Sequence, residues 1–206
     1  DPGQMRFANV DRWPDSVDGF EDLAFMFSSN QLNHGVASLQ FDEAALLFRL
    51  GKNADGPVAE IGRFKGGSTV VFATAGAELW SYDLHVALRA DMSGEQLDRE
   101  LEDALTRLGV RDRVHLFVGD SRTVEPPPEP LAVLFIDGDH SYEGAKADFD
   151  RWSGFVRSGG HVLFHDAVDS GGYGNVYPGV TRAVSEIGAG WARHPGAGSI
   201  AHFVKQ

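Results

Sequence analysis

The chain contains no cysteine, which excludes disulfides, thiolate nucleophiles and cysteine-ligated zinc. It also has no apolar run near the roughly 20 residues that a membrane-spanning helix needs. The first ten residues, DPGQMRFANV, contain no apolar stretch of the signal-peptide type. From these absences we expect a cytoplasmic protein with no membrane partner.

Basic residues are scarce. The 206 residues include 18 Lys and Arg against 30 Asp and Glu, which gives a formal net charge of −12. A surface that binds a phosphate backbone is normally basic, so we expect no nucleic-acid partner. The hydrophobic fraction of 42% and charged fraction of 23% are those of an ordinary globular protein. The length predicts one domain with a sizeable core.

Short apolar runs alternate with helical patterns from Val58 onward. The runs are VAEI (58–61), ELWSYDL (78–84), RVHLFVGD (113–120), LAVLFID (131–137) and GHVLFHD (160–166), with helical patterns at 68–75, 93–108 and 141–156. This alternation predicts βαβ units and a mostly parallel sheet. A helix at 180–187 and strands at 190–194 and 199–205 predict a C-terminal antiparallel hairpin. The expected fold is α/β, a single Rossmann-like, doubly wound sheet.

The segment before Val58 has no such alternation. Helical patterns at 17–27 and 41–50 predict an N-terminal helical cap. We therefore expect residues 1–57 to form this cap and residues 58–206 to form the sheet domain, the two together making one structural unit.

The first predicted strand runs into a glycine-rich loop, EIGRFKGGS (60–68). Doubly wound sheets bind ligands beyond the carboxyl ends of their strands, and Gly62 and Gly66 allow a tight turn there. Ser68 is predicted to cap the following helix. Phe64 replaces the second glycine of a dinucleotide fingerprint, and the Glu60 carboxylate would repel phosphates, so both residues argue against a pyrophosphate cradle. Glu60 instead suits a ligand with an ammonium group, and the alternative is a turn that binds no ligand.

Acidic residues also end the next two predicted strands. Asp83 lies at the end of the second predicted strand and can accept hydrogen bonds from both hydroxyls of a ribose. Asp120 and Ser121 follow the third run and can reach an adenine amine. The alternative for each is a helix cap, a solvated carboxylate or a simple turn signal. The three strand ends together favour a nucleoside site.

A second group of polar residues follows the fourth and fifth runs. Asp137, Asp139 and His140 come after one run, and His165 and Asp166 end the other. Facing carboxylates at neighbouring strand ends repel unless a proton or a cation lies between them, and Mg²⁺ prefers such oxygen ligands. His140 is a candidate general base and Asp139 a rival. Helix capping is the alternative for Asp137 and Asp139. For His165 the alternative is a partly buried, hydrogen-bonded histidine.

These motifs together resemble class I S-adenosylmethionine methyltransferases over roughly residues 58–166, with IDGDHSYEG (136–144) the most specific segment. The branch that they resemble most is that of the metal-dependent sugar O-methyltransferases, such as macrocin and mycinamicin O-methyltransferases. The resemblance implies that S-adenosylmethionine is the cofactor. The residues expected to contact it are Glu60, Gly62, Gly66, Ser68, Asp83, Asp120, Ser121 and Asp137.

The resemblance also implies that Asp137 and Asp166 bind a divalent cation, Mg²⁺ or another, and that His140 is the base, with an acid at the position of Asp139 in some relatives. The family usually has two adjacent acidic residues at the fifth strand end, where this chain has His165 and Asp166. The third ligand is therefore expected to be His165 or Asp169. An imidazole ligand would favour softer metals than Mg²⁺.

The expected function is metal-assisted methylation of a hydroxyl on a sugar or a glycosylated small molecule. The alternatives are a catechol or phenol acceptor, a NAD-binding or cofactor-free α/β module, and a non-catalytic binding protein. His34 and Tyr177 are candidates for lining a substrate pocket, and the glycine-rich segment 169–178 is a candidate lid. Assembly into a homo-oligomer is common in the family that the chain resembles.

Overall fold

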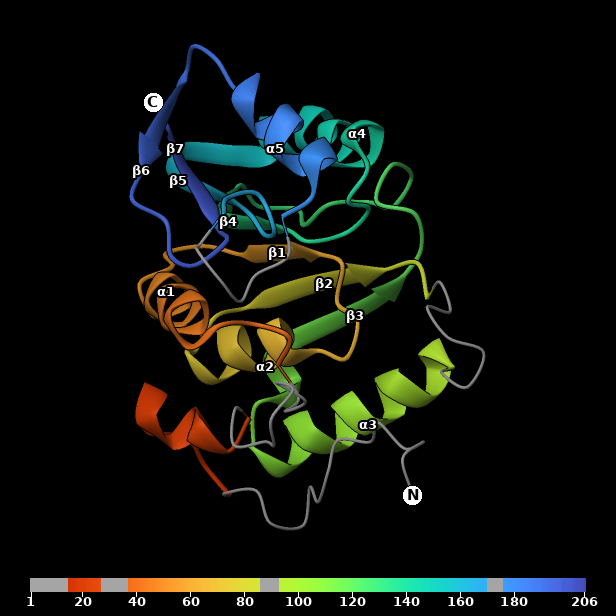
Figure 1. The fold of residues 1–206 in the computed structure, drawn as a ribbon. Helices are drawn as coiled ribbons and strands as arrows, with labels where there is room; N and C mark the ends of the chain where they lie inside the picture. The colour runs from red at the N-terminus through yellow and green to blue at the C-terminus, as the bar shows by residue number, and fades with distance from the viewer. Residues whose placement is uncertain (1–14, 27–36, 86–92, 170–175) are drawn as a thin grey trace.

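The computed structural model describes residues 15–26, 37–85, 93–169 and 176–206. Its centre is a seven-stranded sheet in the order β3-β2-β1-β4-β5-β7-β6 (Figure 1). The strands are β1 (Val58–Ile61), β2 (Leu79–Asp83), β3 (Val114–Val118), β4 (Leu131–Ile136), β5 (Val156–Phe164), β6 (Trp191–His194) and β7 (Ala201–Lys205). β1 to β5 pair in parallel, whereas β7 pairs antiparallel with both β5 and β6. The predicted α/β fold and its C-terminal antiparallel strands are confirmed.

Helices cover both faces of the sheet (Figure 1). α1 (Phe41–Lys52), α2 (Gly67–Thr74) and α3 (Gly94–Arg107) lie on one side, and α4 (Tyr142–Trp152) and α5 (Pro178–Ser185) lie on the other. Short 3₁₀ segments are η2 (Phe20–Met26), η3 (Arg111–Arg113) and η4 (Ser153–Phe155). No helix among the described ranges is long and apolar enough to cross a membrane.

Alternating side chains of the central strands supply two separate cores. In β4, Val133 and Phe135 join the cluster beneath α1, α2 and α3, whereas Leu134 and Ile136 join the cluster beneath α4 and α5. Every residue of β4 is buried, as expected for a parallel strand covered on both faces. This double burial explains why the run LAVLFI is continuously apolar.

The N-terminal segments belong to the first of these cores. Leu23 and Met26 of η2 and Leu47 of α1 are fully buried in the same cluster as Phe72 of α2 and Leu101 of α3. η2 is a 3₁₀ helix that lies within the predicted helix 17–27. The last residue of that prediction lies outside the described ranges. The buried leucine, methionine and phenylalanine side chains attach this segment to the helical layer by the hydrophobic effect.

The predicted boundaries of α4 and β5 were wrong by several residues. α4 ends at Trp152 rather than at residue 156, and Val156 already pairs with Leu131 in the sheet. The next register pair joins Val133 to His161, so β5 carries extra residues between the two pairs. β5 also ends at Phe164, because Asp166 has a positive φ of 55° that is incompatible with an extended strand.

The strand order reverses beside β1, which pairs with β2 on one side and β4 on the other. Such a switch point opens a crevice at the carboxyl ends of the strands, and we call this side of the sheet the carboxyl edge. The turns after β1 and β4 are in close contact there. Gly62 has φ +88°, and a Cβ at this position would lie 2.1 Å from the backbone oxygen of Asp137.

Substituting Gly62→Ala should therefore destabilise the protein more than an ordinary glycine substitution at positive φ. Gly109 (φ +67°) is the matched control, because nothing lies within 4 Å of a Cβ built there. Gly109→Ala should lower the free energy of unfolding by about 1–2 kcal/mol, which is the cost of the left-handed backbone conformation alone. Gly62→Ala should lower the free energy of unfolding by at least about 2 kcal/mol more, because the added methyl group overpacks the contact with Asp137. Urea unfolding measures both variants, and equal losses would contradict the close contact.

Candidate active site

Glu60 lies on the buried side of the carboxyl edge. Its side chain is 0% exposed, and it accepts hydrogen bonds from the hydroxyls of Ser68, Thr69 and Ser81. Burial raises the pKa of Glu60, and the three hydroxyls partly oppose that rise. The predicted capping role of Ser68 was wrong, because the N-cap of α2 is Gly66 and Ser68 donates to Glu60 instead. Both carboxylate oxygens are engaged in joining β1, β2 and α2.

Asp83 ends β2 and holds the glycine-rich loop. Its Oδ2 accepts from the backbone N–H groups of Arg63 and Phe64, both at 2.9 Å, and its Oδ1 accepts from the N–H of His85 at 2.6 Å. The Arg63 side chain is fully buried and forms an ion pair with Asp98 of α3. The loop that the sequence predicted as a ligand cradle is thus fixed to β2 and α3.

The loop after β3 is fixed from α4. The Ser121 hydroxyl donates a hydrogen bond to Asp148, a 4%-exposed residue of α4. The indole N–H of Trp152 donates to the Ser121 carbonyl. Burial raises the pKa of Asp148 to about 6. Asp120 is instead half-buried and forms an ion pair with Arg122, which lowers the pKa of Asp120 to about 2.

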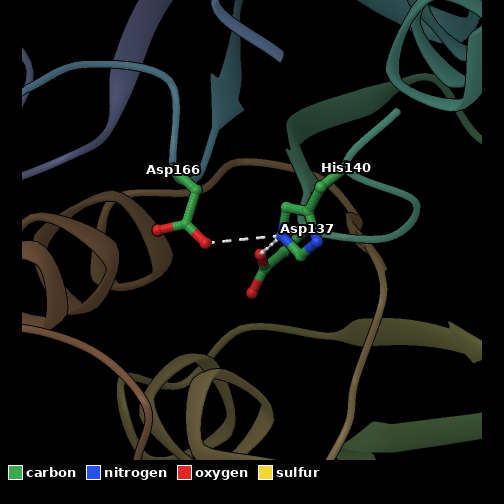
Figure 2. Close-up of side chains that lie close together, drawn as sticks. All are labelled: Asp137, His140 and Asp166. Carbon is green, nitrogen blue, oxygen red and sulfur yellow. Dashed lines mark ion pairs between the residues drawn. The ribbon is translucent and has the colours of Figure 1, made fainter. Parts of the chain in front are cut away.

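Asp137, His140 and Asp166 lie close enough together to form a group of potential metal ligands (Figure 2). Nε2 of His140 lies 3.4 Å from Oδ1 of Asp137 and 3.4 Å from Oδ2 of Asp166. The predicted proximity of the two strand-end aspartates is therefore present, with the histidine between them. The two carboxylates raise the pKa of His140 to about 9. The phenol ring of Tyr177 stacks on the imidazole at a centroid distance of 4.3 Å.

His165 lies behind this group, between two carboxylates. Its Nδ1 is 3.1 Å from Oδ1 of Asp137, and its Nε2 is 3.1 Å from Oε2 of Glu43 on α1. Burial would lower the pKa of His165, but the carboxylates of Asp137, Glu43 and Asp166 outweigh it and raise the pKa well above 6.5. Because both ring nitrogens face carboxylates, the ring fits a charged bridge better than a metal ligand.

The neighbouring candidate base, Asp139, has a local role. Its Oδ1 accepts from the backbone N–H of Ser141 at 2.9 Å, and the residue is exposed. Ser141 is the N-cap of α4, and its hydroxyl oxygen accepts from the N–H of Gly144. The alternative that Asp137 or Asp139 caps this helix is therefore wrong. His34 and residues 170–175 of the predicted lid lie outside the described ranges.

The two carboxylates of the group Asp137, His140 and Asp166 fit a divalent cation. One ligand atom from each residue lies within 4.8 Å of the others. Nε2 of His140 is buried and has no hydrogen-bond partner within the described structure, although buried polar atoms normally have one. A cation held by the two carboxylates would reduce the repulsion between them and would leave this nitrogen available to a bound ligand.

Two buried acids at the site, Glu43 and Asp148, were not predicted. Glu43 is the third residue of α1, where an acidic residue is typical of a helix start. Asp148 lies inside α4 among residues whose pattern indicates only an amphipathic helix. The sequence shows that each helix contains these acidic residues. Which side of each helix is buried is known only from the packing.

The buried histidine gives the fold a specific pH dependence. Because the folded pKa of His165 lies well above its unfolded value near 6.5, folding favours the protonated ring. This stabilisation is fully present below about pH 6.5 and is lost as pH rises through the folded pKa, by at most about 1.4 kcal/mol per pH unit. His140 contributes in the same direction. Urea unfolding at several pH values, in chelator, should give a smaller slope for His165→Gln than for the wild type.

His115→Gln is the control for this measurement. His115 is part-exposed in a 3.4 Å ion pair with Glu78, so its removal should leave the slope unchanged. Equal slopes for His165→Gln and the wild type would show that His165 is neutral in the folded protein.

Solved structures that share the fold include several O-methyltransferases. The O-methyltransferase NovP has a TM-score of 0.64 and 16% identity, with 98% of this chain and 95% of that chain covered. A Bacillus cereus O-methyltransferase in complex with SAH has a TM-score of 0.61 and 17% identity over 95% and 94%. A TDP-rhamnose 3'-O-methyltransferase of calicheamicin biosynthesis has a TM-score of 0.55 and 20% identity over 78% and 76%.

Sequence comparisons give a closer relation over a shorter stretch. An uncharacterized protein of Acanthamoeba polyphaga mimivirus is 38% identical over 63 residues, which span 31% of this chain and 28% of the viral protein. Residues 59–167 match the family described as a methyltransferase domain. That match runs from β1 through the strand end that carries Asp166, and it covers more than half of the 206 residues. The chain belongs to this methyltransferase domain family.

Proposed function

We propose that the protein is an S-adenosylmethionine-dependent O-methyltransferase assisted by a divalent cation. The observation that carries this proposal is the position of Asp137, where two sites meet. Its backbone oxygen packs against Gly62 of the glycine-rich loop, and its carboxylate lies 3.4 Å from Nε2 of His140. We call the group of Asp137, His140 and Asp166 the acidic centre. A methyl donor over the loop and an acceptor at the acidic centre would therefore be neighbours.

The cofactor assignment is supported by family membership and by the ordered loop after β1. The N–H groups of Arg63 and Phe64 are fixed by Asp83, so the loop is preorganised. Preorganisation lowers the entropy cost of binding a ligand. Because Glu60 is engaged by three hydroxyls, we propose that it shapes the loop by holding Ser68 and Thr69 at the start of α2.

Methyl transfer to a hydroxyl forms a carbon–oxygen bond, breaks the carbon–sulfur bond and releases the hydroxyl proton. We assign His140 as the acceptor of that proton, because its Nε2 lies 3.4 Å from each of the two carboxylates that would hold the cation, and a cation there would offset the charge that raises the pKa of this ring. Asp137 and Asp166 would hold the cation, which lowers the pKa of a coordinated hydroxyl. We propose no ligand role for His165, whose ring nitrogens both face carboxylates.

The acceptor that we propose is a sugar hydroxyl. The motifs resemble sugar O-methyltransferases, and one protein of the same fold is a TDP-rhamnose 3'-O-methyltransferase. The stacked pair of Tyr177 and His140 adds an aromatic surface beside the acidic centre. Tyr177 is 37% exposed, so an acceptor ring can reach it.

Cofactor binding is the first test. Calorimetry should detect S-adenosylmethionine but not NADH, and Asp83→Ala should weaken binding at least about tenfold, because it removes the ribose acceptor and frees the loop. Losing a hydrogen bond to a charged group costs about 1.5–3 kcal/mol. Asp112→Ala, at an exposed position of η3, is the control. Unchanged affinity in Asp83→Ala would contradict the cofactor assignment. Transfer of labelled methyl to sugars, nucleotide-sugars and catechols then identifies the acceptor class.

The catalytic centre is tested by removing the cation and the base in turn. Excess chelator should abolish turnover and leave S-adenosylmethionine affinity largely intact. His140→Gln should lower turnover by about 10²–10⁴-fold, which is the usual contribution of general acid–base catalysis, again without loss of cofactor affinity. His115→Gln should retain full turnover. Full activity in chelator would remove the cation from the mechanism, and an unchanged His140→Gln rate would transfer the base role to Asp139.

A further inference from the structure

Glu43 is a carboxylate buried at the junction of α1, β5 and β7. It is 1% exposed, yet its carboxylate oxygens receive hydrogen bonds from three separate segments of the chain. Both Glu43 and its partner Ser199 lie outside residues 59–167, the part that matches the family. Burying a charge is costly unless it is paired and hydrogen-bonded, so such a position calls for an explanation.

One side of the Glu43 carboxylate reaches Asp137 through a histidine. Oε2 of Glu43 is 3.1 Å from Nε2 of His165, and Nδ1 of the same ring is 3.1 Å from Oδ1 of Asp137. The ring therefore cannot rotate without losing a carboxylate partner at each end. It fixes the direction of the Asp137 carboxylate from the buried side.

The other side reaches Asp166 through a serine. The Ser199 hydroxyl donates to Oε1 of Glu43 at 2.8 Å and accepts from the backbone N–H of Asp166 at 3.1 Å. Asp166 has φ +55°, a backbone conformation that non-glycine residues rarely adopt. The two hydrogen bonds that connect Asp166 to Ser199 and Ser199 to Glu43 hold this backbone in place, and with it the direction of the Asp166 side chain.

Capping of α1 does not account for this arrangement. The capping interaction uses the N–H of Gln40, which donates to Oε2 at 2.7 Å. The contacts with His165 and Ser199 join segments that are more than 100 residues away in the sequence. A residue needed only for the helix start would not require them.

We propose that Glu43 is a positioning residue that sets the affinity of the acidic centre for its divalent cation. The inference rests on the cation of the proposed function. Asp137 follows β4 and Asp166 follows β5. Glu43 is connected to both, through His165 and Ser199. Groups that orient ligand carboxylates from behind typically change metal affinity 10–100-fold when they are lost.

The test compares Glu43→Gln with Asp42→Asn by titrating Mn²⁺ at fixed pH, followed by electron paramagnetic resonance. Asp42 is the matched control, because it is the adjacent acidic residue of α1 and contacts Gly198 and the Glu43 N–H rather than His165 or Ser199. Glu43→Gln should weaken Mn²⁺ binding about 10–100-fold, and Asp42→Asn should change it less than about twofold. S-adenosylmethionine affinity should be unchanged in both variants.

Turnover gives a second readout. In Glu43→Gln the Mn²⁺ concentration for half-maximal rate should rise by the same factor as the dissociation constant, while kcat at saturating Mn²⁺ stays within about threefold of the wild type. Ser199→Ala removes only the connection to Asp166 and should weaken Mn²⁺ binding by a smaller factor. It also provides the test if Glu43→Gln does not fold.

The outcomes separate this inference from the proposed function. Wild-type Mn²⁺ affinity in a folded Glu43→Gln variant, or an equal loss in Asp42→Asn, overturns the inference and leaves the methyltransferase proposal intact. Wild-type affinity in Ser199→Ala, where Glu43→Gln does not fold, overturns it as well. A wild-type protein that binds no Mn²⁺ overturns both the inference and the cation of the proposed function.

Discussion

The carboxyl edge of the sheet concentrates negative charge, and every carboxylate there must be supplied with a donor or an opposite charge. The chain does this in different ways. Glu60 receives three hydroxyls, Asp83 receives backbone N–H groups, and Asp137 and Glu43 share His165. Each solution also orders a segment: the start of α2, the glycine-rich loop, and the junction of α1 with β4 and β5. Local electrostatics therefore determines how the loops of the site are held.

Most of the fold could be predicted from the sequence, because parallel strands buried on both faces have a strong apolar signal. The run at β1 coincided with the strand, and the start of the β4 run was also correct. The failures are at boundaries where backbone geometry decides. The change from helix to strand near Val156 depends on pairing with Leu131, and β5 ends early because Asp166 adopts a positive φ. Neither contact is visible in the sequence alone.

The site was predictable to the extent that it lies at strand ends. Topology alone brings Asp137 and Asp166 to neighbouring positions, and the sequence order of the strands predicted this. The roles of individual side chains were less predictable, because they depend on distant partners. Ser68 was expected as a cap but serves Glu60, and Glu43 has the sequence signature of a helix start although its partners come from β5 and the loop before β7.

The same packing separates the two histidines of the acidic centre. His165 is 7% exposed and has a carboxylate at each ring nitrogen, so the surrounding charges favour the protonated ring. His140 is more exposed, and one face of its ring lies against Tyr177, while its Nε2 has no hydrogen-bond partner within the described residues. A proton on His165 would stabilise the carboxylates from the buried side, whereas the His140 side chain is 32% exposed. The two histidines therefore differ in burial and in the number of ring nitrogens that face carboxylates, which is two for His165 and one for His140.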